Sequence, residues 1–273
     1  MLQLTQKLSN GDMVVQEVPQ PVLGTGMIII RNCYSLISAG TEGSTAQAAR
    51  KSLIGKAREK PQQIQQVLDV IVQQGPVQAY RAVAKKLEAY SPLGYSSAGE
   101  VIGVGDNITE FKVGDNIACA GVGCANHAEI VAVPVNLCVK LNKNADLKNA
   151  AYNTLGAIAM QSVRQADLRL GESCAVIGLG LLGQLTCLIL KASGVRVVGI
   201  DINDSVVETA VANCTDWAML RNTPGIEDNI SDFTGGLGVD AVIIAAATDS
   251  TDPINFAGAI ARKKGKVVIL GAV

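Results

Sequence analysis

The stretch Cys174-Ala-Val-Ile-Gly178-Leu-Gly180-Leu-Leu-Gly183 decides how the second half of this chain folds. An apolar run ends in a glycine-rich turn, and an apolar segment of helical character, residues 184–193, follows directly. Gly178 permits a tight turn, Gly180 allows the backbone to approach a pyrophosphate, and Gly183 allows the helix to pack closely on the strand. The pattern is typical of the strand, turn and helix that begin a dinucleotide-binding unit.

A second apolar strand, residues 195–200, is followed by Asp201, which lies 23 residues beyond Gly178. A carboxylate at this place accepts hydrogen bonds from both ribose hydroxyls of an adenosine and repels a 2′-phosphate, which favours NAD over NADP. The phosphates are expected at the helix N-terminus, where free N–H groups and the helix dipole favour anions. The rival interpretation is an S-adenosylmethionine site, but such turns usually lack a third glycine placed like Gly183. We assign to the cofactor site Gly178, Gly180, Leu181, Leu182, Gly183, Asp201, Ile202 and Asn203.

From residue 147 onward, helical and strand-like segments alternate. We predict helices at 149–165, 205–213, 225–234 and 253–262, and further strands at 218–220, 239–246 and 266–271. This alternation predicts a doubly wound parallel sheet with helices on both faces. Because ligands lie at the carboxyl ends of such strands, we expect residues 246–248 and 270–273 to line the cofactor site. The residues added to that site are Ala246, Ala247, Thr248, Gly271, Ala272 and Val273.

The chain stops at Val273, on an apolar strand. We count five strands in this domain, whereas a doubly wound dinucleotide domain normally has six. We therefore expect the last strand to be missing from this chain or to be supplied by another chain. An uncovered edge strand tends to pair with another edge, so we also expect a homo-oligomer, a dimer in the simplest case.

Residues 1–148 have a different sequence pattern, with short strand-like runs separated by Gly, Asn and Asp. We predict strands at 13–18, 27–35, 99–104, 116–120 and 128–133, which indicates a small barrel-like β domain. Residues 43–91 interrupt this domain with three segments of helical spacing. This insertion carries eight Lys or Arg against three acidic residues, a net charge of +5. A solvated helical face explains the charge, and the alternative is a surface that attracts an anionic substrate, such as a phosphorylated sugar.

Composition narrows the function classes. The chain has 273 residues, of which 48% are apolar and 17% charged, and its net charge of −1 gives no indication of a nucleic-acid or membrane-surface partner. Apolar runs such as 241–247 are far shorter than the ~18 residues that span a bilayer, and the first residues show no export signal. We therefore expect a cytoplasmic protein. Seven scattered cysteines indicate neither a disulfide framework nor a structural zinc.

A β domain of this pattern followed by this nucleotide domain resembles the medium-chain dehydrogenase/reductase superfamily, the relatives of zinc-type alcohol dehydrogenase. The resemblance covers the whole chain and rests on Leu93-Gly94 with Ala98-Gly99-Glu-Val101, on Phe111-Lys-Val-Gly-Asp115, on residues 128–134 and on the glycine turn. It implies a GroES-like β-barrel domain, residues 1–148 with the helical insertion 43–91, followed by an incomplete Rossmann domain, residues 149–273.

A narrower resemblance connects the chain with bacterial threonine-dehydrogenase-like proteins. It rests on Tyr34-Ser-Leu-Ile-Ser-Ala-Gly-Thr-Glu42, on Pro92-Leu-Gly-Tyr-Ser-Ser-Ala-Gly99 and on Arg262-Lys-Lys-Gly-Lys. In some of these proteins the module precedes a second oxidoreductase domain, and sugar or polysaccharide chemistry is the usual suspicion. The resemblance therefore implies a small-molecule substrate that is a sugar derivative.

The zinc ligands of the superfamily are replaced in this chain. Relatives that use zinc have a cysteine, a histidine and a third ligand where this chain has Ala39, Tyr95 and Leu155. A catalytic zinc needs three N, S or O ligands and an open position, and alanine and leucine supply none. We therefore expect no catalytic zinc, against the commonest chemistry of the superfamily.

Without a Lewis acid, hydride transfer needs hydrogen-bond donors or an acid/base that takes the alcohol proton. The resemblance places Thr41 where zinc-type relatives keep a proton-relaying hydroxyl, Tyr95 at the vacated histidine position, and Glu42 as the nearest carboxylate. Each has a structural alternative: a turn hydrogen bond for Thr41, packing for Tyr95 and a salt bridge for Glu42. His127, the only histidine, is a general-base candidate by residue type, but its sequence neighbourhood favours a structural role.

The leading hypothesis is a zinc-independent NAD(H)-dependent oxidoreductase that acts on an alcohol/carbonyl pair. A second enzymatic hypothesis is an NADPH-dependent quinone or enoyl reductase, against which Asp201 counts. A third, of a different class, is a dinucleotide-binding module without turnover of its own, as half of a larger protein. Fold-level analogy does not decide among them.

Overall fold

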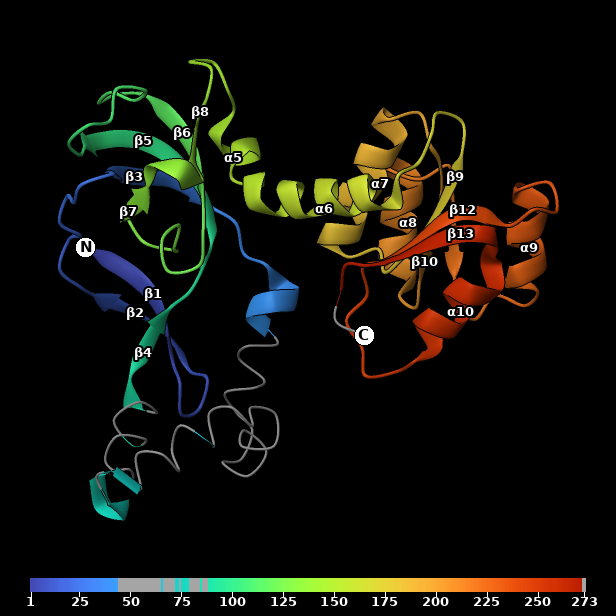
Figure 1. Cartoon of the computed structure of the whole chain (residues 1–273), viewed down its shortest axis with the longest axis horizontal. Coiled ribbons are helices and arrows are strands. Elements are labelled where there is room, and N and C mark those ends of the chain that lie inside the picture. Colours follow the sequence, from blue (N-terminus) through green and yellow to red (C-terminus); the bar gives the residue numbers. More distant parts are fainter. Residues whose placement is uncertain (44–64, 66–71, 74, 79–83, 85–87, 272–273) are drawn as a thin grey trace. The chain divides into compact units, whose positions relative to one another are not determined.

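The computed structural model describes residues 1–43, 65, 72–73, 75–78, 84 and 88–271 (Figure 1). Most of the predicted helical insertion at 43–91 lies outside the described residues, as do Ala272 and Val273 of the predicted cofactor site. The chain forms two compact units, Met1–Thr154 and Leu155–Val273, whereas the sequence analysis placed the division after residue 148. Within the described ranges, every helix is too short or too polar to cross a membrane.

The first unit is built on a curled antiparallel sheet in the order β7-β3-β5-β6-β8 (Figure 1). These strands are β3 (Met27–Ser35), β5 (Ser96–Val104), β6 (Asn116–Ala120), β7 (Ile130–Pro134) and β8 (Cys138–Lys140). A smaller sheet, β2-β1-β4, joins it through a bridge between Gln3 and Ala128. It contains β1 (Leu2–Lys7), β2 (Met13–Glu17) and β4 (Tyr90–Pro92). The predicted barrel-like β domain is thus confirmed.

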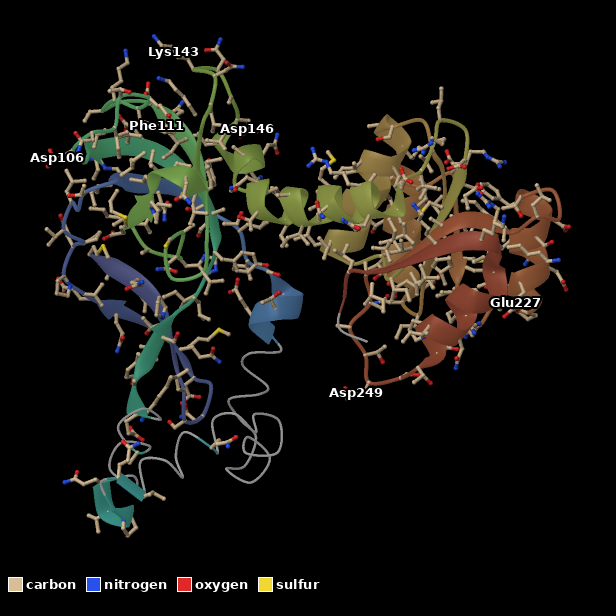
Figure 2. All side chains as sticks on the ribbon, viewed as in Figure 1. Asp106, Phe111, Lys143, Asp146, Glu227 and Asp249 are labelled. Atoms are coloured by element: carbon tan, nitrogen blue, oxygen red, sulfur yellow. The ribbon has the colours of Figure 1, made fainter. Side chains whose placement is uncertain are left out.

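The core of the first unit follows from alternating side chains on its longest strands. Ile28 and Ile30 of β3 and Val101 of β5 are fully buried, and Phe111, labelled in Figure 2, packs against the same cluster. The apolar run at 27–30 is a strand signal, and β3 was predicted with its correct bounds. Three strands were not predicted: β1, β4 and β8. In β1 the buried side chains include Thr5 and Gln6, at 4% and 1% exposure, so its polarity pattern gives no strand signal.

The second unit is a doubly wound domain with a five-stranded sheet in the order β11-β10-β9-β12-β13, in which every pair of neighbours is parallel. Its strands are β9 (Ser173–Ile177), β10 (Arg196–Asp201), β11 (Trp217–Leu220), β12 (Val239–Ile244) and β13 (Ala261–Ile269). The predicted Rossmann architecture with five strands is confirmed. Among the described residues β13 pairs with β12 alone, and its Val267 and Ile269 are 44% and 56% exposed.

Helices cover both faces of this parallel sheet. Cys174 and Val176 of β9 pack in one cluster with α7 (Leu181–Ala192) and α8 (Asp204–Asn213). Ala175 and Ile177 of the same strand pack in a second cluster with α9 (Ile226–Phe233) and α10 (Asp252–Ile260). A strand buried on both faces reads as a continuous apolar run, which is why the sequence located β9 and β12.

The predicted helix at 149–165 is two helices. The first, α5 (Leu147–Ala150), begins at Asp146, whose carboxylate accepts a hydrogen bond from the backbone N–H of Lys148 (Figure 2). The second, α6 (Asn153–Ala166), begins after a break at residues 151–152. The Asn153 amide donates to the carbonyl oxygens of Ser97 and Cys119, each at 3.2 Å, which fixes a new helix start beside β5 and β6.

The glycine turn after β9 is held by two close approaches. Gly178 has a φ of 96°, and a Cβ on it would lie 2.5 Å from the backbone nitrogen of Ala246. A Cβ on Gly183 would lie 1.8 Å from the carbonyl oxygen of Gly178. Helix α7 therefore touches the turn that precedes it, as the sequence predicted.

Replacing Gly183 with alanine tests this contact. The added methyl group overlaps the Gly178 carbonyl, so we expect the free energy of unfolding to fall by about 1–3 kcal/mol, the usual cost of overpacking. Trp217, the only tryptophan, lies in β11 of this unit, and its fluorescence in urea gives the measurement. The matched control is Gly156→Ala in α6, where an added Cβ meets nothing within 4 Å. Equal losses in both variants would contradict the close-packing interpretation.

Candidate cofactor and catalytic sites

The carboxyl ends of the parallel strands bring three predicted cofactor residues, Gly178, Ala246 and Gly271, to one edge of the sheet. The backbone N–H of Gly178 donates to the carbonyl of Ile200, and the N–H of Ala246 donates to that of Ile177. A Cβ on Gly271 would lie 1.8 Å from the carbonyl oxygen of Ala246. The glycine turn, the end of β10, the loop after β12 and the end of β13 therefore meet, as predicted from the order of the strands. The loop after β12 carries Ala247 and Thr248 and continues to Asp249, labelled in Figure 2.

The turn itself fits a dinucleotide pyrophosphate. Gly180 is the N-cap of α7 and has no side-chain cap, and the space at its Cβ position is empty to 4 Å. The first helical residues, Leu181 and Leu182, follow with no acidic side chain in the first turn. Free N–H groups and the helix dipole make such an end favourable for an anion. The backbone of this turn would hold the phosphates.

Asp201 is fixed by the turn it faces. Its Oδ2 accepts a hydrogen bond of 2.6 Å from the backbone N–H of Leu179, and its Oδ1 accepts one of 2.9 Å from the N–H of Asn203. Each carboxylate oxygen has two acceptor sites, so both oxygens remain able to accept from a ribose hydroxyl. Asn203 in turn caps α8 by accepting from the N–H of Ser205. The carboxylate is thus held at the place that the sequence predicted for it.

A depression of about 300 Å³ lies next to Asp201 and is lined by Ile202, Arg221, Asn222 and Asp252. Ile202 is 86% exposed there. Arg221 makes two hydrogen bonds to the Asp252 carboxylate, at 2.9 and 3.0 Å, and its guanidinium lies 3.9 Å from the centre of the Phe256 ring. The one cation lining this depression in the described structure is therefore already paired.

Sequence reasoning missed Arg221, Asn222 and Asp252. The first two directly follow β11, at the same carboxyl-end edge as the predicted site residues. That position was a usable signal. The ion pair gave no usable signal in the sequence, because its partners are 31 residues apart and meet only when α10 packs on the sheet.

In the first unit, two of the predicted catalytic residues lie on a helical turn at residues 39–43. Thr41 is exposed, whereas Glu42 is only 7% exposed. Both carboxylate oxygens of Glu42 lie 3.2 Å from Nε2 of His127, and Oε1 also accepts from the backbone N–H of Ser38. Glu42 is therefore a salt-bridge or hydrogen-bond partner of His127, a pairing that the sequence did not predict because 85 residues separate the two.

His127 is the centre of this arrangement. Its Nδ1 lies 2.8 Å from the hydroxyl oxygen of Ser35, its backbone N–H donates to the carbonyl of Leu93, and its own carbonyl accepts from Leu4. Gly94 packs against the ring so closely that a Cβ would come within 2.9 Å of Nδ1. Residue 127 is thus fixed by three segments of the unit.

Tyr95 follows Gly94 and is half-buried. Its carbonyl accepts hydrogen bonds from the Gly121 N–H and the Thr154 hydroxyl, while its phenol has no hydrogen-bond partner among the residues described. The phenol is therefore available as a donor.

The residues that replace the zinc ligands do not fit a zinc ion. Ala39 is exposed and Leu155 is buried, and neither side chain has a donor atom. Within the described ranges, no three His, Cys, Asp or Glu side chains lie close enough together to hold a metal. Burial raises the pKa of Cys119 to about 11 and that of Cys138 to about 12, so these neighbouring thiols are protonated near neutral pH.

Comparison with known proteins places this architecture among dehydrogenases. A family model described as zinc-binding dehydrogenase matches residues 182–273. D-guloside 3-dehydrogenase of Escherichia coli is 29% identical over 153 residues, which are 55% of this chain and 43% of that protein. D-xylulose reductase A of Aspergillus oryzae is 27% identical over 192 residues, 58% of this chain and 53% of that protein. The matches thus span about half the length of these relatives.

A solved structure resembles the fold along the whole chain. The quinone oxidoreductase of Escherichia coli, complexed with NADPH, superposes with a TM-score of 0.72 at 15% identity, covering 100% of this chain and 75% of that one. At this identity the likeness concerns the fold alone.

Removing the Glu42 side chain tests whether the His127 contact holds the 39–43 turn. Glu42→Ala leaves Nε2 of the buried ring and the Ser38 N–H without the partner they have now, so we expect a loss of about 3 kcal/mol in the free energy of unfolding. Circular dichroism in urea gives the measurement, and Trp217 fluorescence reports separately that the second unit is unaffected. The control is Glu100→Ala, whose exposed contact with Arg31 is 3.8 Å long and should contribute less than about 1 kcal/mol. Similar losses in both variants would show that the buried contact does not hold the turn.

Proposed function

This chain belongs to the medium-chain dehydrogenase/reductase superfamily, and we propose that it is a zinc-independent, NAD(H)-dependent oxidoreductase that acts on an alcohol/carbonyl pair. The superfamily membership supports an oxidoreductase. The cofactor, the absence of zinc and the substrate are our proposals. The observation that carries them is the nucleotide edge of the second unit, where a fixed carboxylate and a neutralised arginine lie side by side with a glycine turn that fits phosphates.

The preference for NAD follows from charge at this edge. An NADP site needs a cation to receive the 2′-phosphate. Here Asp201 occupies the ribose position, and Arg221, the cation in the adjoining depression, is held by both oxygens of Asp252. A 2′-phosphate would therefore meet the negative charge of Asp201 and a guanidinium whose positive charge Asp252 already compensates.

The catalytic chemistry follows from the side chains that remain where zinc ligands stand in relatives. When bound, the nicotinamide supplies the hydride acceptor or donor, which is the difficult part of the chemistry. We propose that the phenol of Tyr95 donates a hydrogen bond to the substrate oxygen and that the hydroxyl of Thr41 transfers its proton. Glu42 supplies the carboxylate that accepts this proton from Thr41. Such groups contribute to hydride transfer by taking the charge or the proton that develops on the oxygen.

The substrate that we propose is a sugar derivative. Two relatives support it, because D-guloside 3-dehydrogenase and D-xylulose reductase both act on polyhydroxylated compounds by name. The proposal fits the exposed residue Thr41 and the phenol of Tyr95, which has no hydrogen-bond partner among the residues described, because hydroxyl groups are suited to a substrate rich in hydroxyl groups.

Two alternatives lead to different experimental results. The first is an NADPH-dependent quinone or enoyl reductase, which the charges around Asp201 disfavour. The replaced zinc ligands favour a module that binds the nucleotide without turnover.

Cofactor choice is tested by titrating the protein with NADH and NADPH and following energy transfer from Trp217. We expect NADH to bind at least about tenfold more tightly, since one unfavourable charge contact is worth about 1.4 kcal/mol or more. The double variant Asp201→Asn, Asp252→Ala frees Arg221 and should reverse or abolish the preference. The control is Asp232→Ala, in the last turn of α9. This variant should keep the preference for NADH. Tighter NADPH binding by the unmodified protein would contradict the proposal.

Turnover and metal independence are tested together. We expect NAD-dependent oxidation of methyl D-gulosides or pentitols, unchanged after treatment with a metal chelator. Loss of activity on chelation, with recovery on adding zinc, would contradict zinc independence. NADH binding without turnover of any sugar derivative would favour the module without catalysis.

A further inference from the structure

The hydrogen bonds of His127 extend in both directions along the ring. On one side Nε2 faces both oxygens of Glu42 at 3.2 Å, and on the other Nδ1 faces the Ser35 hydroxyl at 2.8 Å. The ring and the carboxylate are buried, with side chains 7% and 8% exposed. Glu42, His127 and Ser35 thus form an unbroken chain of groups, each of which is able to accept and release a proton.

One end of this chain opens to solvent. Ser35 and His127 line a groove of about 320 Å³ in the surface of the first unit, together with Leu2, Val15, Tyr34 and Glu129. The walls are exposed, with Val15 at 60% and Tyr34 at 48%. Ser35 itself is half-buried. The chain therefore begins at a buried carboxylate, that of the residue after Thr41 in the sequence, and ends at a hydroxyl on the wall of an open groove.

We propose that Glu42, His127 and Ser35 form a proton relay that carries the proton of the substrate alcohol to water in this groove. The proposal rests on the proposed oxidoreductase function. When the alcohol is oxidised, the hydrogen of its C–H bond would leave together with the bonding electron pair, as hydride, for a bound nicotinamide. Its O–H bond breaks, and the proton leaves through the Thr41 hydroxyl to the Glu42 carboxylate. His127 accepts this proton at Nε2 and releases one from Nδ1 to Ser35, whose own proton passes to water. One proton enters and one leaves, and reduction of a carbonyl runs the same path backwards.

The arrangement has more contacts than a packing role requires. Backbone bonds to Leu93 and Leu4 and the close contact with Gly94 already fix residue 127. The two ring nitrogens add partners that differ in kind, an acid on one side and a solvent-facing hydroxyl on the other. The titratable groups around the ring, besides Glu42, are Glu129, Cys33 and Tyr34 of the groove, and Tyr95, which follows Gly94. Among the described residues no Lys or Arg lines the groove, so an emerging proton meets no positive side chain from them.

The single histidine makes the relay observable without substrate or cofactor. With ¹⁵N-labelled histidine, the imidazole spectrum of the whole protein contains one ring, that of His127. For a relay we expect both tautomers in exchange and a ring proton that exchanges with water. Ser35→Ala should leave one tautomer, with the proton on Nε2 facing Glu42, and slow the exchange by about tenfold or more. The control Tyr34→Phe changes the same groove wall and should leave the spectrum unchanged. A single tautomer with equal protection in the unmodified protein and in Ser35→Ala overturns the relay.

Turnover gives the second readout. We expect His127→Ala to lower kcat for alcohol oxidation about 100-fold, the order that acid–base catalysis contributes, with KM changed by less than about twofold. Added imidazole should restore part of kcat, and Ser35→Ala should show a smaller loss with a larger solvent isotope effect. Tyr34→Phe should retain full activity. A loss that imidazole does not restore, in a variant that still folds by circular dichroism, would mean that His127 only supports the 39–43 turn.

The two readouts separate the relay from the function on which it rests. If the unmodified protein binds NADH but oxidises no sugar derivative, the proposed function fails, and the imidazole spectrum alone then decides whether a proton path exists. If turnover is found and the spectrum shows a fixed, protected ring, the function stands and the relay fails.

Discussion

The close approach of α7 to the turn before it is the constraint on which the second unit depends. Because Gly183 has no side chain, the helix touches the Gly178 carbonyl, and the turn can be tight enough to leave its N–H groups pointing outward. The same compact turn packs against Ala246, on which Gly271 packs in turn, and it positions the N–H of Leu179 to donate to Asp201. The backbone that we propose for the phosphates, the carboxylate that we propose for the ribose and the meeting of the strand ends thus all depend on the absence of side chains at Gly178 and Gly183.

The sequence was most informative where burial is uniform. Strands β9 and β12 are buried on both faces and the helices between them are amphipathic, so the order of elements and the edge that carries the ligand were predictable. In the first unit, β1 was not predictable, because its buried side chains include the polar residues Thr5 and Gln6. Buried positions of a strand are usually apolar. The break between α5 and α6 was missed for a similar reason, since it depends on Asn153 reaching carbonyls of β5 and β6.

The candidate sites divide in the same way. The glycines and Asp201 were predictable because a local motif fixes their spacing. The contacts of Arg221 with Asp252, and of His127 with Glu42 and Ser35, join residues 31 to 92 positions apart, and nothing local in the sequence marks them. Glu42 was a candidate through family resemblance alone, and the structure adds what resemblance does not contain, namely the partner of its carboxylate.

The residues that set the charge beside the nucleotide edge have an evolutionary consequence. Arg221 and Asp252 lie at the surface, with side chains 27% and 51% exposed, and their carboxylate–guanidinium contact is not part of the clusters that hold the sheet. Substitutions there therefore cost little stability, as is usual for surface positions. Selection can change which nucleotide this domain accepts through two or three codons, while the core that presents the turn is inherited unchanged.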